Sequence, residues 1–348
     1  MKGGEIMKKK LFSIIMCLVM ILTILPIYAF AEADLSNWTY NVLRDSTAEI
    51  TGYNGSDTEL VFPEEIDGYT MVAIADNAFK GTVTSYRNFT SVTIPETYTR
   101  IGDNNFYRYY DLAEINLPHT LTYIGINSFV GTKVYEDNYW YCIANNQSAV
   151  FYIGEYLIFS NQNQNYKDYY AINPGTKLIA TGAFVNNDDL PGVIIPEGVE
   201  YIGPSAFAGC FWFCYAVFPN TLKSIGKYAF AANDMLDAVV IPEGVSEIDE
   251  LAFYNSEQFL TIYGVKGSAA EEFANKRGLE FIETKDIVYG DIDQDGTVTI
   301  TDYSSTKSNV CGETELSGTA HIVGDMNSDC VIDAFDLFQI DRTVNNLN

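Results

Sequence analysis

The chain has 348 residues, 47% of them hydrophobic, and carries a formal net charge of −26. This length and apolar content allow two modest domains with real cores, and they exclude a disordered polymer. Only 20 Lys and Arg residues stand against 46 acids, so neither nucleic acid nor an anionic membrane surface is an expected partner.

Residues 1–31 have the composition of an export signal. Three consecutive lysines precede the apolar stretch Leu11–Phe30, and the small-x-small pattern Ala-Phe-Ala ends at Ala31. We predict cleavage after Ala31, a secreted mature protein, and no membrane span after cleavage. The alternative is an uncleaved anchor, because the stretch is long enough to cross a bilayer.

A repeated unit fills residues 32–284. Prolines recur 23 residues apart, at positions 95 and 118 and again at 196, 219 and 242. Apolar residues stand six and one before each proline and six and eleven after it, as in Leu236, Ile241, Ile248 and Phe253 around Pro242. This period predicts a solenoid in which each coil ends a short strand at its proline and stacked coils share one core.

Glycines follow the Ile that stands six residues after four of the prolines. They are Gly102, Gly125, Gly203 and Gly226. A glycine repeated at this point predicts a turn that needs a positive φ.

The repeat pattern, L-x-x-V-x-I-P-x-x-V-x-x-I-G-x-x-A-F, resembles the BspA-like, treponemal-type leucine-rich repeat family from about Trp38 to Phe281. The opening resembles that family's N-terminal cap, and residues 131–184 resemble its longer, irregular central coil. Residues 261–281, with a helix over Ser268–Arg277, resemble its closing cap. The resemblance implies a mixed α/β solenoid with a parallel sheet of one strand per 23-residue coil, and a noncatalytic surface or secreted protein that binds something.

One face of the predicted sheet becomes apolar toward the C-terminal coils. Residues two before the prolines change from Thr93 and Asn116 to Ile194, Val217 and Val240, with Tyr215 beside them. Contiguous exposed apolar surface often marks a partner site, so these residues form a candidate ligand face. The alternative is that β-branched residues stand there for strand propensity.

The last part of the chain, residues 290–348, follows a short linker at 285–289 and contains two similar acidic segments. They are DIDQDGTVTITD (Asp291–Asp302) and DMNSDCVIDAFD (Asp325–Asp336), with oxygen-bearing side chains at positions 1, 3, 5, 9 and 12. Calcium takes six or more oxygen ligands, and this spacing folds five side chains and one carbonyl around one point. The alternative is an acidic turn without metal. We predict two calcium ions, one in each segment. The first is held by Asp291, Asp293, Asp295, Thr297, Thr299 and Asp302, and the second by Asp325, Asn327, Asp329, Val331, Asp333 and Asp336. Thr297 and Val331 contribute their backbone carbonyl oxygens.

Position 6 of these segments is Gly296 in the first copy and Cys330 in the second. That position often demands a positive φ, so the second calcium site is expected to be weaker.

The doubled D-x-D-x-D-G-x-V-x-x-x-D pattern, each copy followed by an apolar-spaced helix, resembles the type I dockerin, a small α calcium-binding domain. Dockerins attach secreted components of a cellulosome to cohesin domains of a scaffoldin. By the family's pattern, the residues that meet cohesin are Ile300, Thr301, Lys307 and Ser308 in the first copy, and Ala334, Phe335, Asp341 and Arg342 in the second. Because the copies differ, a symmetric two-way binding mode is not expected, and Phe335 with Arg342 is the better anchor.

Catalysis is not expected. The chain has two histidines, His119 and His321, both expected to face solvent, which leaves little for a nucleophile and base pair. We therefore predict a secreted, noncatalytic binding or adhesion subunit that docks through calcium onto a cohesin, with an unknown protein or glycan ligand for the repeats. The alternatives are a carbohydrate-binding accessory or enzyme of polysaccharide degradation, suggested by 25 Tyr and 3 Trp, and a structural spacer.

Overall fold

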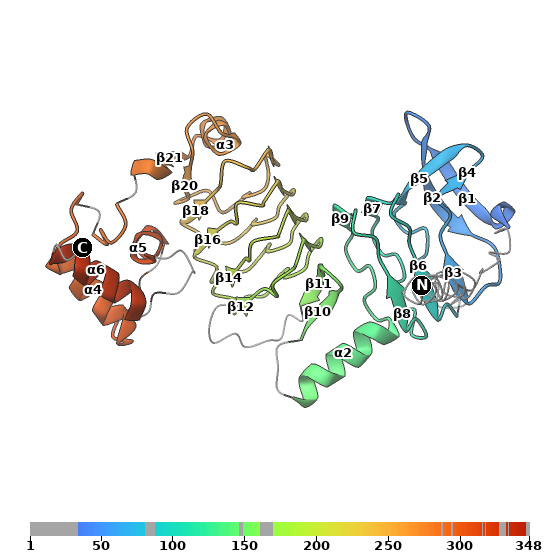
Figure 1. The fold of residues 1–348 in the computed structure, drawn as a ribbon, viewed down its shortest axis with the longest axis horizontal. Helices are drawn as coiled ribbons and strands as arrows, with labels where there is room; N and C mark the ends of the chain where they lie inside the picture. The colour runs from blue at the N-terminus through green and yellow to red at the C-terminus, as the bar shows by residue number, and fades with distance from the viewer. Residues whose placement is uncertain are drawn as a thin grey trace, which may run out of the picture. The chain divides into compact units, whose positions relative to one another are not determined.

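The computed structural model describes residues 34–80, 88–145, 149–160, 170–286, 288–293, 295–314, 316, 318–326, 332 and 334–345 (Figure 1). The predicted signal, residues 1–31, lies outside the described residues. The chain divides into Met1–Ser36 and one compact unit, Asn37–Asn348, which holds every strand and α-helix named below.

The first coils are closed by antiparallel strands. A short 3-10 helix, η1 (Leu35–Asn37), leads into β1 (Trp38–Val42), which pairs antiparallel with β2 (Thr47–Tyr53). The strand β4 (Glu65–Ile66) pairs antiparallel with β5 (Tyr69–Ile74), and β2 pairs parallel with β5. The Trp38 ring lies 4.7 Å from the Tyr53 ring and 5.0 Å from the Phe62 ring, so the cap seals the end of the core with aromatic side chains.

Beyond this cap the chain is a solenoid of parallel strands in which the predicted sheet takes one strand from each coil, as expected, and a second, shorter strand of each coil pairs in a further parallel sheet. In the coils with a proline at 63, 95, 118, 196, 219 or 242 the predicted strand ends two residues before that proline. Strands of this kind form three separate parallel sheets along the stack. These strands are β3 (Glu59–Val61), β6 (Ser91–Thr93) and β8 (Glu114–Asn116); β12 (Tyr170–Ala171) and β14 (Val193–Ile194); and β16 (Tyr215–Val217), β18 (Ala238–Val240), β20 (Thr261–Gly264) and β21 (Glu280–Glu283).

The second strand of each coil has two residues and ends at the regularly spaced Ile of the repeat, which in most coils stands six residues after the proline. These strands are β7 (Arg100–Ile101), β9 (Tyr123–Ile124), β13 (Leu178–Ile179), β15 (Tyr201–Ile202), β17 (Ser224–Ile225) and β19 (Glu247–Ile248). They pair in parallel with the equivalent residues of the next coil, for example Tyr201 with Ser224. Two residues are too few to show a strand alternation in the sequence, which is why this strand was not predicted.

An irregular coil interrupts the regular repeats in the middle of the solenoid. It contains the helix α2 (Lys133–Ala144) and the antiparallel pair β10 (Val150–Ile153) and β11 (Tyr156–Ser160). The parallel pairing resumes where β11 joins β13. The sequence predicted a longer coil here but not its helix.

Stacked phenylalanines form the centre of the solenoid. Phe207 lies with its ring centroid 5.3 Å from that of Phe184 and 5.1 Å from that of Phe230, and Phe230 lies 5.4 Å from Phe253. All four rings are fully buried. One Phe per coil, ten or eleven residues after the proline, therefore makes a continuous aromatic column that no single coil could bury.

The four repeated glycines are needed for close approach between coils, which corrects the predicted reason. None of them has a positive φ. A Cβ on Gly102 would lie 2.5 Å from the Asp76 backbone nitrogen, and a Cβ on Gly226 would lie 2.7 Å from the Pro204 nitrogen. The neighbouring coil occupies the space that a side chain would need.

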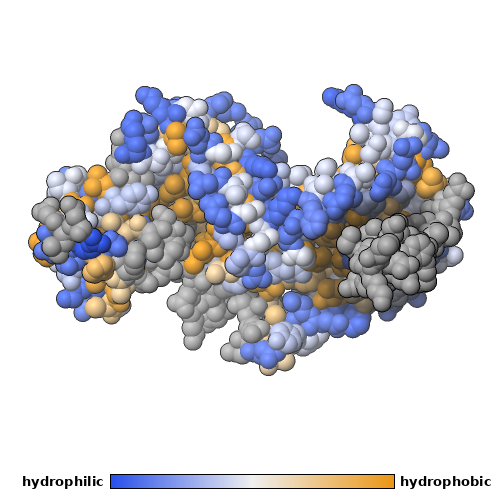
Figure 2. Space-filling model, viewed as in Figure 1, coloured by the Kyte–Doolittle hydropathy of each residue, from blue (hydrophilic) through white to orange (hydrophobic). Residues whose placement is uncertain are grey.

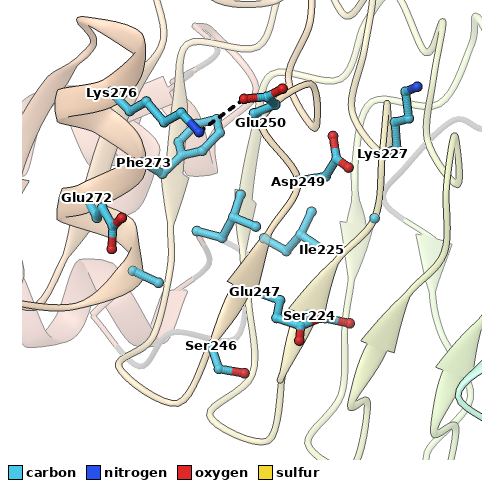
Figure 3. A pocket seen from close by; sticks show the side chains of 13 residues that line it. Ser224, Ile225, Lys227, Ser246, Glu247, Asp249, Glu250, Glu272, Phe273 and Lys276 are labelled. Atoms are coloured by element: carbon cyan, nitrogen blue, oxygen red, sulfur yellow. Dashed lines mark ion pairs between the residues drawn. The ribbon is translucent and has the colours of Figure 1, made fainter.

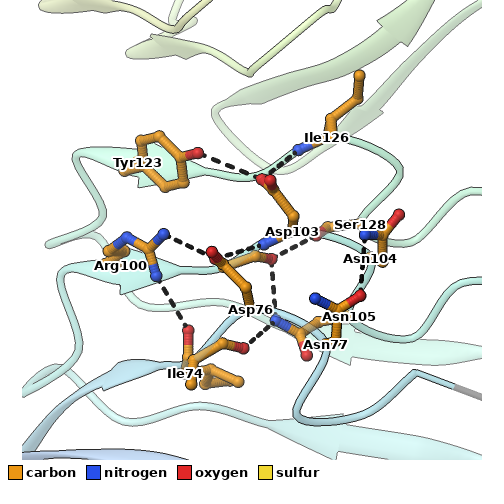
Figure 4. Close-up of polar contacts among 12 residues, drawn as sticks. Ile74, Asp76, Asn77, Arg100, Asp103, Asn104, Asn105, Tyr123, Ile126 and Ser128 are labelled. Carbon is orange, nitrogen blue, oxygen red and sulfur yellow. Dashed lines mark hydrogen bonds and ion pairs between the residues drawn. The ribbon is translucent and has the colours of Figure 1, made fainter.

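Aspartates tie successive N-terminal coils together beside these glycines (Figure 4). An Asp76 carboxylate oxygen accepts a hydrogen bond from the Asp103 backbone N–H at 3.0 Å and from Arg100 at 2.7 Å. Asp103 repeats the arrangement one coil later, because its carboxylate accepts from the Ile126 N–H at 3.0 Å and from the Tyr123 hydroxyl at 3.2 Å. The backbone N–H groups left free at these turns are thus satisfied by side chains of the preceding coil.

A helix closes the C-terminal end, as predicted. It is α3 (Ala269–Arg277), which starts after the N-cap residue Ser268 and ends at Gly278 in the left-handed conformation with φ 70°. Phe273 packs its ring 5.6 Å from Phe253 and so covers the end of the aromatic column. No helix among the described residues has both the length and the apolar content to span a membrane.

Candidate calcium and cohesin site

Three short helices follow the solenoid. After the 3-10 helix η2 (Thr284–Asp286) come α4 (Ile300–Val310), α5 (Gly318–Gly324) and α6 (Ala334–Val344). Their shared core consists of Ile292, Val323 and Ile340, with Val298, Tyr303, Leu316, Ala320, Met326 and Val344 packed around it. A core this small is typical of domains that need a metal ion or another staple to fold.

The first acidic segment is a loop held by the carboxylate of Asp302. One of its oxygens accepts hydrogen bonds from the Ile292 N–H at 2.7 Å and the Asp293 N–H at 3.1 Å. The other accepts from the Thr299 N–H at 2.8 Å, and Thr299 caps α4 in return through a capping box. The last residue of the loop therefore pins its beginning to the N-terminus of the helix.

Three carboxylates of this loop converge. One oxygen each of Asp291, Asp293 and Asp302 lie within 4.8 Å of one another, and Asp291 and Asp302 are buried. No described lysine, arginine or histidine forms an ion pair with any of the three. Oxygen-only donors that converge without a basic partner fit a hard cation such as calcium.

The protonation behaviour of the loop agrees with a crowded anionic site. Burial on its own would raise the pKa of Asp302, but the N–H groups of Thr299, Asp293 and Ile292 lower it on balance. The pKa of Asp293 is raised by desolvation and by the charges of Asp302, Asp295 and Asp291. The loop thus gathers negative charge at one point.

The other predicted ligands of loop one lie outside this three-carboxylate group. Asp295 is exposed, and one of its oxygens accepts from the Thr297 N–H at 2.9 Å and from its hydroxyl at 2.7 Å. The Thr299 hydroxyl accepts from the Thr301 N–H as part of the helix cap. Coordination by Asp295, by the Thr297 carbonyl and by Thr299 stays a prediction.

Loop two repeats the frame of loop one as far as the structure describes it. Asp325 and Asp336 are buried, and an Asp336 oxygen accepts from the Met326 N–H at 2.8 Å, 34 residues after the equivalent bond from Ile292 to Asp302. The predicted ligands Asn327, Asp329, Val331 and Asp333, together with Cys330, lie outside the described residues.

The predicted cohesin-contacting residues lie on α4 and α6. Ile300, Thr301 and Lys307 are exposed on α4, and Ser308 is half-buried and donates to Glu313 at 3.0 Å. On α6, Ala334 is exposed and Asp341 and Arg342 are half-buried; the side chain of Phe335 lies outside the described residues. Contact of these residues with cohesin stays a prediction.

One residue of this face was missed by the sequence reasoning. Phe338 is 56% exposed, and the Arg342 guanidinium lies 5.9 Å from its ring centroid. It stands one helical turn after Ala334 and one before Arg342, so the i, i+4 spacing of α6 would have found it. An exposed aromatic held by an Arg is the kind of residue that dominates binding energy.

The predicted ligand face of the repeats is only partly open. Ile194, Val217 and Val240 are half-buried, and the Tyr215 side chain lies outside the described residues. Val217 and Val240 pack in an apolar cluster that includes Ile322 of α5. Binding of a ligand on this face stays a prediction.

A hollow of about 590 Å³ lies beside the closing helix, between β17, β19 and α3 (Figure 3). It contains Glu247, Asp249 and Glu272, and Glu250 pairs with Lys276 at 3.0 Å. The hydrogen bond and charge of Lys276 lower the pKa of Glu250. A carboxyl with a lowered pKa is a poor general acid, so Glu250 is not suited to that role.

The two histidines differ in exposure. His119 is exposed and lies 3.3 Å from a Glu155 oxygen. His321 is 4% exposed, so the prediction that it faces solvent is wrong, because α5 is enclosed by packed side chains. The Nδ1 atom of His321 lies 3.3 Å from the Leu316 carbonyl oxygen.

Comparison with known families agrees with this architecture. The model of the BspA type leucine-rich repeat region, in 6 copies, matches residues 23–158 and 152–270. The chain belongs to the BspA-type leucine-rich repeat family. The dockerin type I domain matches residues 289–345. The chain is thus a cellulosome-type component that attaches to cohesin through a dockerin, a calcium-binding domain, and both matched modules are noncatalytic types.

Solved structures with some likeness are also leucine-rich repeat proteins. A leucine-rich cell surface protein from Faecalibacterium prausnitzii is 18% identical with a TM-score of 0.30, covering 71% of this chain and 93% of that one. The T. pallidum leucine rich repeat protein is 20% identical with a TM-score of 0.27, covering 71% and 96%. These likenesses are too distant to transfer a function. No curated protein matches the chain.

Proposed function

We propose that this protein is a secreted, noncatalytic binding subunit that two calcium ions organise for docking onto a scaffoldin cohesin, while its repeats present a protein-binding surface. The observation that carries the docking half is the convergence of Asp291, Asp293 and Asp302 at the start of α4. Secretion rests on the signal-like residues 1–31, and the second ion on the buried Asp325 and Asp336.

The calcium loop and the cohesin face belong to one rigid arrangement. Asp302 lies in the first turn of α4, two residues after Ile300, so fixing the loop also fixes the orientation of the recognition helix. The equivalent Asp336 lies in the first turn of α6 and is equally buried. Metal binding at the loops therefore positions both helices whose exposed residues are proposed to meet cohesin.

The second copy is expected to supply the stronger anchor for cohesin. Phe338→Ala should weaken binding by about 10-fold or more, because truncating an exposed aromatic at the centre of a contact typically removes over 1 kcal/mol. The double change Phe335→Ala with Arg342→Ala should weaken binding more than Ile300→Ala with Lys307→Ala. Isothermal titration with calcium-loaded protein and one cohesin measures all three. Ser304→Ala, the equivalent of Phe338 in the first copy, is the matched control, and equal losses from both copies would contradict the preference.

For the ligand of the repeats we assign an apolar ridge beside the sheet formed by β16, β18 and β20. Hydrophobic surface gathers in separate areas of the molecule, one of them between α3 and the C-terminal helices (Figure 2). The segments that lead into these strands expose Phe211, Trp212, Met235 and Phe259. The pairing of β16 with β18 and of β18 with β20 brings these segments side by side, and from this we infer that the four residues form one ridge.

Acidic residues accompany the ridge, which favours a protein partner with basic residues around an apolar contact. Asp188 and Asp189 are exposed one coil before Phe211 and Trp212, and Asp234 is exposed one coil after them. Phosphate-bearing and anionic partners would be repelled. Stacking of Trp212 on a sugar is the second candidate, because an exposed Trp beside carboxylates also suits a neutral glycan.

Capture experiments test the ridge. Trp212→Ala with Phe211→Ala should lower capture of a basic bacterial or host surface protein by about 10-fold or more, since aromatic residues carry most interface energy. The control is Tyr110→Ala, an exposed aromatic at the position equivalent to Phe211 in an N-terminal coil. If the parent chain is retained on plant cell-wall polysaccharide and captures no protein, the ligand is a glycan. If the Trp212→Ala with Phe211→Ala variant captures protein as well as the parent chain does, the ridge is not the binding surface.

A further inference from the structure

An apolar cluster joins the last part of the solenoid to the helix between the two calcium loops. Its buried members are Ala238 on β18, Tyr263 on β20 and Ile322 on α5. Half-buried Cys214, Val217, Val240 and Ile282 surround them. Ile322 is 3% exposed although it stands on a helix of the dockerin, so it is covered by the repeats and not by its own small core.

The helix α5 is apolar on two sides. The residue next to Ile322, Val323, packs into the dockerin core with Ile292 and Ile340. The Val323 carbonyl also accepts a hydrogen bond from the Gly290 N–H at 2.6 Å. A short helix that buries two different sides needs a partner on each, and here the dockerin core supplies one and the sheet of β16, β18 and β20 supplies the other.

The connection between the modules favours this contact. The strand β21 pairs with β20 at the edge of the same sheet, and residues 284–290, seven in number, separate its end from Asp291. A tether this short gives a high effective concentration of one module at the other, so even a small apolar patch is occupied.

We propose that the β16, β18 and β20 face is an intramolecular seat for α5, which holds the dockerin against the repeats instead of leaving it on a free tether. The occupant of the Val217 and Val240 stripe is therefore this chain's own Ile322. The helices α4 and α6, which are proposed to contact cohesin, stay accessible to it in this arrangement, because Ile300 on α4 is 63% exposed and Phe338 on α6 is also exposed. The seat fixes the direction in which the repeats project from a bound cohesin, and it does not depend on which ligand the repeats bind.

Hydrogen exchange on the full calcium-loaded chain tests the seat from its repeat side. Val240→Asp should raise the exchange rate of the α5 amides by about 10-fold or more, because it places a charge in the cluster without touching the dockerin core. Ile194→Asp is the matched control: it changes the same repeat position two coils earlier, outside the cluster, and should leave α5 unchanged. Binding to cohesin should stay within about 2-fold for both variants.

A second variant tests the seat from the dockerin side. Ile322→Asp should raise amide exchange in β16 and β18, and small-angle scattering should show a longer maximum dimension. If Ile322→Asp abolishes cohesin binding, the dockerin has unfolded, and the exchange of the α5 amides in Val240→Asp then tests the proposal by itself. Unchanged α5 protection in Val240→Asp, with the same scattering profile as the parent chain, would overturn the proposal.

Discussion

Removing calcium with EDTA is expected to weaken cohesin binding by at least about 100-fold, or about 2.8 kcal/mol. The carboxylates of Asp291, Asp293 and Asp302 converge within 4.8 Å, and without a cation they repel one another in a partly buried loop. The same loop fixes the start of α4, so its opening also releases the recognition residues. Isothermal titration in calcium and in EDTA measures the loss, and far-UV circular dichroism reports the accompanying loss of helix.

Single substitutions separate the metal from a general effect of charge. Asp302→Ala should reproduce most of the EDTA effect, because Asp302 both belongs to the converging group and accepts three backbone hydrogen bonds. Glu243→Gln, a change at an exposed acid of the repeats outside both loops, should leave binding nearly unchanged. Full-strength cohesin binding by the EDTA-treated chain would contradict the calcium-dependent docking mechanism.

Phe207→Ala is expected to lower the free energy of unfolding of the repeat domain by about 3–5 kcal/mol. Its fully buried ring stacks between Phe184 and Phe230 in the aromatic column, and the close-packed coils on either side cannot collapse into the space it leaves. Urea unfolding followed by tyrosine and tryptophan fluorescence measures the change.

Phe211→Ala provides the matched control for the column. It removes the same ring four residues later in the same coil, but Phe211 is exposed, so the free energy of unfolding should change by no more than about 0.5 kcal/mol. Equal losses from the two substitutions would mean that the column does not carry the stability of the coils.

The solenoid was predictable because each coil repeats the same residue types at the same spacing. A proline that cannot donate to a sheet, an Ile and a Phe recur at constant spacing, and only a stack of coils can bury such a face. The calcium loop was predictable for a similar reason, since the ligand spacing is local and lies within twelve consecutive residues.

The misses are contacts between residues far apart in the chain. Gly102 and Gly226 are required by the approach of a neighbouring coil, although the sequence suggested a turn conformation. Phe338 is a different kind of miss: its spacing from Ala334 and Arg342 is local and could have been read from the sequence, and only its exposure depends on how α6 packs.

The sequence by itself determined the repeat period, the two acidic calcium-type loops and the strongly acidic character of the chain, because each of these depends only on local spacing or composition. Only the tertiary structure decided that each coil carries a second strand, that His321 is buried, and that Val217 and Val240 meet Ile322. Each of these depends on which surfaces come together after folding, and burial between distant segments leaves no periodic trace in the residues of either one.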